Sequence, residues 1–220
     1  MNPERANPLV VVVFGVGLAA AILLTGPLLL FLPPVVSFEQ GRHDVPALLD
    51  AEPAAVDRAT AAMLGDLLFD GDFRVSLDGE QPVLDESERS HMRDVGGVVR
   101  ALVIVDLLAL LVVALGAIAL RRDRGSRGMA QLVAAGGLAA VAILLGAFFA
   151  LAFDTAFTAF HGIFFDPGTW QFGPDSNLLR FFPEPFWFEI ALVAGVAIVL
   201  SAVLVAWLGR RDLVAARTAG

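Results

Sequence analysis

The amino-acid sequence predicts an all-α membrane protein with four transmembrane helices and a small extracytoplasmic cap made of a helix and a β-hairpin. Hydrophobic residues make up 57% of the 220 residues, and the mean hydropathy is +0.75. The chain contains four apolar runs of roughly 20 residues or more, the length that a helix needs to cross about 30 Å of hydrocarbon. Because backbone groups inside a bilayer must pair within their own segment, we expect each run to be a helix.

These four runs divide the chain into spans and water-exposed segments. We expect a single membrane domain over residues 1–220, in which 32–94 form an extracytoplasmic cap insert and 154–187 form an extracytoplasmic aromatic loop. The predicted spans cover about residues 9–31, 98–120, 130–153 and 188–208.

The distribution of charge predicts the orientation in the membrane. The short loop 121–127 has four arginines against one acid, Asp123, whereas residues 32–94 hold fourteen acids and five arginines. By the positive-inside rule the basic loop and both termini are cytoplasmic in a cell membrane, and the acidic insert lies outside. The net charge of −8 comes mainly from that insert, so we expect no nucleic-acid partner.

The insert has local order of its own. Residues 53–68 place apolar side chains on one helical face, as in an amphipathic helix. Residues 73–77 alternate in polarity and precede Asp78-Gly79 and a second apolar stretch at 82–84, which predicts a small β-hairpin. The chain has no cysteine, so packing rather than disulfides must hold the insert.

The second long helix is expected to begin before the membrane, at about Glu86. Asp85 is a suitable N-cap, and Glu88 three residues later completes a capping box. At about 100° per residue, Glu88 and His91 share one stripe of this helix, and arginines occupy another. Glu88 is open to two interpretations, a helix cap or a group of the site.

Two of the three histidines have matching positions relative to two spans. His91 lies ten residues before the apolar run that starts at Ala101, and His161 lies eight residues after the third run ends at Phe153. We expect the third helix to continue outward to His161, with Asp154 on nearly the same face. A single interfacial histidine is most simply a packed side chain, but this pairing favours a shared proton-transfer site.

Two motifs around these histidines are specific enough to compare with known families. They are Glu88-Arg89-Ser90-His91-Met92-Arg93-Asp94-Val95 and Phe160-His161-Gly162-Ile163-Phe164-Phe165, followed by Trp170, Phe172 and Pro183-Glu184-x-Phe186-Trp187. Together with the four spans, this pattern resembles the Lit family, the lipoprotein intramolecular transacylases of bacterial membranes, over nearly the whole chain.

The resemblance implies a reaction and its site. The sn-2 acyl chain of a diacylglyceryl-cysteine would move to the α-amino group of that cysteine and give a lyso-form lipoprotein. His91 and His161 would be catalytic, on the outer side, without metal or cofactor. The partners would be a diacylated lipoprotein N-terminus and membrane lipid, and the sequence does not indicate an oligomeric state.

The chemistry of the residues is compatible with this reaction. An α-ammonium group must lose a proton before it attacks an ester, and imidazole is matched to accept it. No cysteine nucleophile and no Gly-x-Ser-x-Gly motif is present. Several side chains remain open as orienting groups or as donors to the oxyanion or substrate: Glu88, Asp94, Asp154, Asp166 and Glu184 as orienting groups, and Arg89, Arg93, Trp170 and Asn177 as donors.

Three other classes of function are alternatives. A transporter usually has more spans and internal repeat symmetry, so four spans without a repeat argue against that class. A metal-dependent membrane hydrolase would need a third ligand beside the two histidines, and the sequence has no His-x-x-x-His motif or cysteine pair. A non-catalytic membrane partner protein would explain the spans but not the paired histidine motifs.

Overall fold

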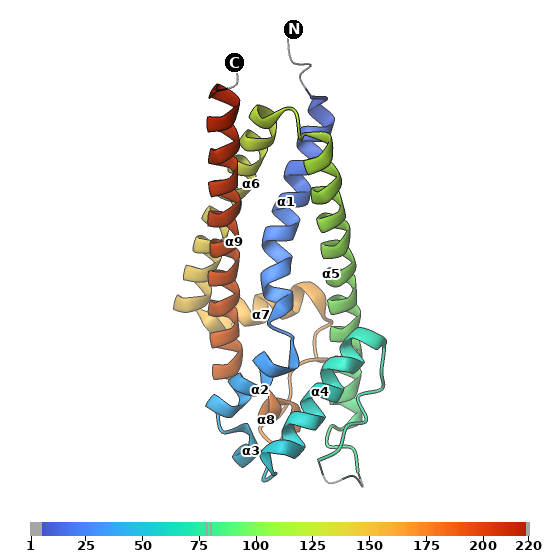
Figure 1. Cartoon of the computed structure of the whole chain (residues 1–220). Coiled ribbons are helices and arrows are strands. Elements are labelled where there is room, and N and C mark those ends of the chain that lie inside the picture. Colours follow the sequence, from blue (N-terminus) through green and yellow to red (C-terminus); the bar gives the residue numbers. More distant parts are fainter. Residues whose placement is uncertain (1–5, 78, 80, 219–220) are drawn as a thin grey trace. The chain divides into compact units, whose positions relative to one another are not determined.

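The computed structural model describes residues 6–77, 79 and 81–218, and these residues form nine helices without a β-strand. Four helices are long and apolar enough to cross a membrane, which confirms an all-helical multi-pass membrane protein (Figure 1). They are α1 (Pro8–Leu29), α5 (Glu86–Ala119), α6 (Arg124–Leu151) and α9 (Glu184–Thr218). The shorter helices are α2 (Pro33–Arg42), α3 (Val45–Leu48), α4 (Pro53–Phe69), α7 (Phe153–Phe164) and α8 (Asn177–Phe181).

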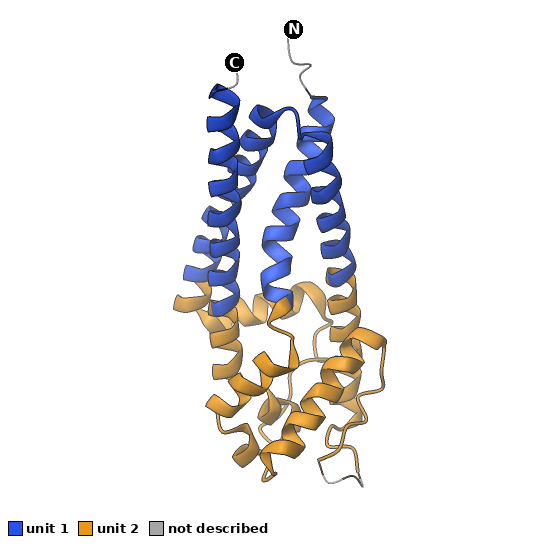
Figure 2. Ribbon diagram, in the orientation of Figure 1, with its two compact units in different colours: residues 1–28, 103–147, 193–220 blue, residues 29–102, 148–192 orange. Residues whose placement is uncertain are grey.

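The chain forms two compact units, which Figure 2 shows in different colours. Unit 1 comprises residues 1–28, 103–147 and 193–220, and unit 2 comprises residues 29–102 and 148–192. Each long helix therefore contributes residues to both units.

Small residues allow the helices of unit 1 to approach closely. A Cβ atom added at Gly17 of α1 would lie 2.7 Å from Val112 of α5, and one at Gly116 would lie 2.6 Å from Phe14. Such contacts are typical of helix pairs in membranes, where packing rather than hydrophobic burial drives association. One buried acid also joins these helices, because the Thr25 hydroxyl donates a 2.9 Å hydrogen bond to Asp106.

A core of apolar side chains organises unit 2. It gathers residues of α2, α3, α4, α5 and α8, among them the fully buried Met63 and Phe181. One buried polar chain crosses this core: the Thr60 hydroxyl donates to Gln40, whose amide donates to the Phe181 carbonyl. Because each of these buried polar groups is paired, the hydrogen bonds connect α2 to α4 and α8 without leaving a buried polar group unsatisfied.

The predicted β-hairpin is wrong. Phe73, Val75 and Leu84 are buried in the core of unit 2, but the described residues around them form no strand. Phe73 has a φ of 55°, and its N–H donates to the side chain of Asp66 in α4 rather than to a partner strand. The alternating polarity therefore reflects side chains such as Phe73 and Val75 that are buried in the core, on a segment without regular secondary structure. The expected turn at Asp78-Gly79 lies partly outside the described residues, since Asp78 is one of those not described.

The second correction concerns the third long helix. α6 ends at Leu151 and α7 begins at Phe153, because Ala152 leaves the helical conformation with φ −145° and ψ 54°. His161 therefore belongs to a separate helix rather than to an extension of the third span. The second long helix agrees with expectation: Asp85 and Glu88 each accept the other's backbone N–H at 2.8 Å, which is a complete capping box.

Candidate active site

The imidazole rings of His91 and His161 lie next to each other in unit 2. Their centroids are 6.1 Å apart and their planes differ by 26°, so the two rings are stacked. His91 lies in the second turn of α5, before the apolar part of that helix, and His161 lies in the last turn of α7. Residues 70 positions apart thus bring two proton-transfer groups together.

Hydrogen bonding fixes the orientation of the His161 ring. Its Nδ1 lies 2.8 Å from the carbonyl oxygen of Phe157, one helical turn earlier. Because a carbonyl oxygen only accepts, Nδ1 carries the proton and Nε2 of the neutral ring keeps its lone pair. Asp154 was expected to orient this ring, but it is exposed and makes no hydrogen bond to His161 in the described part of the chain.

Aromatic side chains enclose both imidazoles. Phe165 contacts both rings, with centroids 4.9 Å from His91 and 5.6 Å from His161. Phe172 completes the surroundings of His91 at 5.6 Å, and Trp170 lies 4.6 Å from His161. The site is therefore a largely apolar enclosure around two basic nitrogens.

This enclosure favours the neutral form of both rings. Burial lowers the pKa of His91 to about 4, the positive charge of His161 adds to that effect, and Asp94 partly opposes it. Burial also lowers the pKa of His161, against the contact with the Phe157 carbonyl. Both imidazoles are thus available as proton acceptors at neutral pH.

Glu88 makes no hydrogen bond to either histidine among the described residues. One carboxylate oxygen completes the capping box of α5, and the other accepts hydrogen bonds from the Ser176 hydroxyl at 2.5 Å and the Leu178 N–H at 2.9 Å. Ser176 is also the N-cap of α8. Glu88 therefore positions the end of the aromatic loop against α5. The sequence predicted its role as a helix cap but not this second role.

Arg89 and Arg93 of α5 are engaged with an acid on the same helix. Glu86 accepts hydrogen bonds from Arg89 at 2.5 Å and from Arg93 at 2.9 Å. Nε of Arg89 is buried without a hydrogen-bond partner in the described part of the chain, so Arg89 keeps one unused donor. Asp94, one turn beyond His91, is exposed.

The remaining predicted site residues lie in different surroundings. The Asn177 amide donates to the Val83 carbonyl at 2.8 Å and is a structural contact. Asp166 is exposed in a turn, where its carbonyl accepts from Thr169, and Glu184 is exposed at the start of α9. Among the described residues, no hydrogen bond or ion pair joins these three side chains to either histidine.

Sequence reasoning missed the Phe157 carbonyl, which shapes the site. It included Phe165 and Phe172 in the motifs but did not predict their contacts with the His91 ring. Once residues 153–164 are known to be helical, the i−4 position of Phe157 predicts that its carbonyl lies near the His161 side chain.

The outer face of α7 is apolar and exposed. Ile163 is 75% exposed, and Phe160 and Phe164 are nearly half exposed. They neighbour His161 in sequence, and Phe160 and Phe164 are themselves in ring contact. Such a face suits the boundary between lipid and water, so His161 lies beside a surface that hydrocarbon chains can cover.

One group of side chains in unit 2 has ligand atoms close enough to share a cation. It consists of Glu39, His43 and Glu189 and does not include the paired histidines. The Arg42 guanidinium already contacts both Glu39 and Glu189. The cluster is thus charge-compensated by an arginine, and neither His91 nor His161 belongs to a metal-type group of three in the described residues.

Comparison with known proteins agrees with this arrangement. The crystal structure of the membrane-integral lipoprotein intramolecular transacylase Lit from Bacillus cereus superposes with a TM-score of 0.84, at 20% identity, over 96% of this chain and 97% of that chain. A form of the same protein with one histidine replaced by arginine gives a TM-score of 0.74, at 18% identity, over 96% and 94% of the two chains. At these identities the match shows a shared fold.

Sequence similarity gives the family. An uncharacterized protein of Aquifex aeolicus is 33% identical over 57 residues, which span 26% of this chain and 26% of that protein. The profile of the family described as lipoprotein intramolecular transacylase Lit matches residues 13–187. The expected resemblance is confirmed, and the chain belongs to the Lit family of membrane transacylases.

Proposed function

We propose that this chain moves the sn-2 acyl chain of a diacylated lipoprotein to the α-amino group of the lipid-modified cysteine, with His91 and His161 as the catalytic pair. The observation that carries the proposal is the stacked imidazole pair, in which the Phe157 carbonyl holds one ring as a neutral acceptor. The family match supports the reaction class.

The protons of the reaction balance through these two rings. Nε2 of His161 accepts one proton from the substrate ammonium and passes it to water. The amine nitrogen then attacks the ester carbonyl carbon, forming the C–N bond and a tetrahedral oxyanion. His91 accepts the second proton from that nitrogen and delivers it to the glyceryl oxygen as the C–O bond breaks. The products are an amide, a free sn-2 hydroxyl and one released proton.

The low pKa of His91 suits the second step. A ring with a pKa of about 4 is neutral when the tetrahedral intermediate forms, and once protonated it is a strong acid toward an alkoxide. Exclusion of water by Phe165 and Phe172 protects the ester from hydrolysis while the transfer proceeds.

Trp170 is the best-placed donor for the oxyanion. Its ring lies 4.6 Å from that of His161, whereas Asn177 is bonded to Val83 and Arg93 to Glu86. An indole N–H has no acceptor function and is suited to this role. Arg89 of α5, with its unused Nε, is the second candidate donor.

The site is proposed to face the extracytoplasmic side, with both termini in the cytoplasm. The arginines of residues 121–127 and of the tail after residue 208 support this orientation through the positive-inside rule. Unit 1 supports it too, because the start of α1, the α5–α6 turn and the end of α9 lie at the same end of that unit (Figure 1).

The reaction is tested by following a diacylglyceryl peptide with the purified protein. Transfer leaves the mass unchanged, blocks the amine and frees a glyceryl hydroxyl, and fragmentation locates the acyl chain. Release of free fatty acid with an unblocked amine would instead identify a hydrolase. We expect isomerisation by the wild-type chain, and full activity of a His91→Asn/His161→Asn chain would reject the proposed site.

A further inference from the structure

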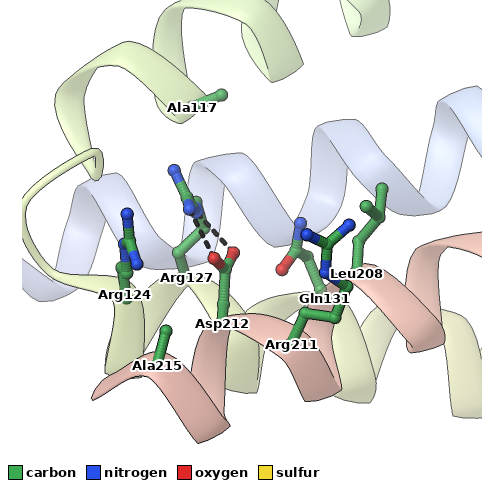
Figure 3. Close-up of a pocket in the computed structure, with 8 residues that line it drawn as sticks. All are labelled: Ala117, Arg124, Arg127, Gln131, Leu208, Arg211, Asp212 and Ala215. Atoms are coloured by element: carbon green, nitrogen blue, oxygen red, sulfur yellow. Dashed lines mark hydrogen bonds and ion pairs between the residues drawn. The ribbon is translucent and has the colours of Figure 1, made fainter. Parts of the chain in front are cut away.

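Unit 1 contains a cavity remote in sequence from the paired histidines. It has a volume of about 360 Å³ and lies where the ends of α5, α6 and α9 meet (Figure 3). This volume is in the range of small-ligand sites. The cavity is not part of the proposed reaction.

The lining is strongly basic. Arg124, Arg127 and Arg211 line the cavity with a single acid, Asp212, so the formal charge is two positive units in excess. Asp212 is fully engaged by Arg127, which donates two hydrogen bonds of 2.5 and 2.6 Å (Figure 3). Arg211 has a cation–π contact with Trp207 at 4.7 Å, and neither Arg124 nor Arg211 has an ion pair with another described residue. Two guanidinium groups therefore remain for an anion.

A buried amide also lacks a partner in this cavity. Gln131 is 8% exposed, and its Oε1 is buried without a hydrogen-bond donor in the described part of the chain. An unpaired buried acceptor is destabilising, so a ligand that supplies a hydroxyl hydrogen would relieve it. The cavity thus requires an anion and a hydrogen-bond donor in the same ligand.

The position of the cavity along the helices indicates the source of that ligand. Leu208 lines it at the point where the apolar part of α9 ends and Arg210 and Arg211 begin. Trp207 beside it is 52% exposed, as tryptophans at the headgroup level of a bilayer are, and Leu204 one turn earlier is 57% exposed. Acyl chains can lie along that apolar face while a headgroup enters the basic cavity.

We propose that this cavity binds the headgroup of an anionic glycerophospholipid, with the phosphate on Arg124 and Arg211 and a headgroup hydroxyl on Gln131. Phosphatidylglycerol has both features, a phosphodiester and free hydroxyl groups. Bound lipid would close the cavity between α6 and α9 and so stabilise unit 1.

The test measures lipid binding by the full chain in detergent micelles, by native mass spectrometry and by thermal unfolding. Phosphatidylglycerol should bind at least about tenfold more tightly than phosphatidylcholine with the same acyl chains. A basic residue near an anionic membrane surface contributes about fivefold, so Arg124→Gln/Arg211→Gln should weaken phosphatidylglycerol binding by about 25-fold. Arg122→Gln is the matched control, because Arg122 is exposed in the same basic segment and does not line the cavity.

A second variant tests the role of the amide without changing charge. Wild-type protein should prefer phosphatidylglycerol to phosphatidylmethanol, which has the same charge but no hydroxyl, and Gln131→Leu should abolish that preference. If Arg122→Gln weakens phosphatidylglycerol binding as much as Arg124→Gln/Arg211→Gln does, the attraction is a diffuse effect of surface charge, and the proposal is overturned. Tight binding of glycerol 1-phosphate or inorganic phosphate without lipid would assign the cavity to a soluble anion and also overturn it.

Discussion

The carboxylate of Glu88 accepts a 2.5 Å hydrogen bond from the hydroxyl of Ser176, 88 residues further along the chain. Glu88 is only 2% exposed, and the same carboxylate also binds the backbone N–H groups of Asp85 and Leu178. One side chain therefore caps α5 and fixes the end of the aromatic loop against it. The histidine on α5 and the aromatic residues that enclose it depend on this contact for their relative positions.

Replacement of Glu88 should therefore destabilise unit 2. Glu88→Ala leaves the buried N–H of Leu178 and the part-buried Ser176 hydroxyl and Asp85 N–H without their acceptor. An unpaired buried group costs about 1–3 kcal/mol, and the part-buried groups cost less because water can reach them. We expect a clear fall in the melting temperature, and a smaller fall for Glu88→Gln, which keeps one acceptor oxygen. Glu86→Ala is the matched control: Glu86 is exposed, and such surface ion pairs contribute about 0–1 kcal/mol. Equal melting temperatures for Glu88→Ala and Glu86→Ala would contradict this role.

Substitution of either paired histidine should abolish most of the transfer without unfolding the protein. General acid–base steps contribute about 10²–10⁴-fold each, so His91→Asn and His161→Asn should each lose activity in that range. The double variant should lose less than the product of the two, because both rings serve one proton path.

The third histidine provides the control for this series. His43 lies near Glu39 and Glu189, and no ring contact joins it to His91 or His161 in the described part of the chain. His43→Gln should stay within a few-fold of the wild-type rate in the diacylglyceryl peptide assay. A His161→Asn chain with near wild-type turnover would remove that residue from the mechanism.

The dependence of the rate on pH should follow the substrate amine rather than the histidines. Burial lowers both imidazole pKa values below the usual 6.5, so both rings are neutral bases over the range pH 7–8. The α-amine, with a pKa of about 7.7–8.0, is the group that must still lose a proton. We expect kcat/KM to rise through pH 7–8 with one apparent ionisation.

A variant that opens the enclosure should add a second ionisation. Phe165→Ala exposes both rings to water, which raises their pKa values toward the usual 6.5 and makes the rate fall further below that pH. Histidine C–H resonances of a His43→Gln background would report the two pKa values directly. A wild-type His91 pKa of 6.5 or above would contradict the effect of burial.

The sequence predicted the local features of this fold better than the contacts between segments. The start of α5 was predictable because the Asp85 and Glu88 capping box lies within four residues. The irregular course at Phe73 was not, because it depends on an acceptor in α4, the side chain of Asp66. The break at Ala152 falls inside a continuous apolar run without proline or glycine next to it, so no local signal marks it.

The site shows the same division. Counting residues from the apolar runs predicted that His91 and His161 pair, and their rings are adjacent. The helix-length argument behind that prediction fails for His161, because α6 ends at Leu151 and His161 lies in the separate helix α7. The group that orients His161 was missed, because a backbone carbonyl such as that of Phe157 is present at every position and leaves no trace in composition. Charged side chains such as Asp154 were therefore preferred as the groups that orient His161, but Asp154 is exposed.

The orientation in the membrane can be tested with single cysteines, because the chain has none of its own. Ser126→Cys lies in the basic segment and Asp175→Cys in the aromatic loop, where Asp175 is exposed. In intact cells an impermeant maleimide should label Asp175→Cys, and Ser126→Cys only after the membrane is opened. The reverse labelling pattern would place the histidine pair on the cytoplasmic side.

Trp170 should act through its N–H rather than through its ring alone. Trp170→Phe keeps an aromatic side chain beside His161 but removes the donor proposed for the oxyanion. Loss of one such donor typically lowers kcat by about 10²–10³-fold, so we expect a loss near 10²-fold in kcat with little change in KM. Trp187→Phe is the matched control, because Trp187 packs against Phe182 and Phe186 away from the histidines. If Trp170→Phe retains the wild-type kcat while Trp170→Ala loses it, the ring only packs against His161, and the unused Nε of Arg89 becomes the oxyanion donor to test next.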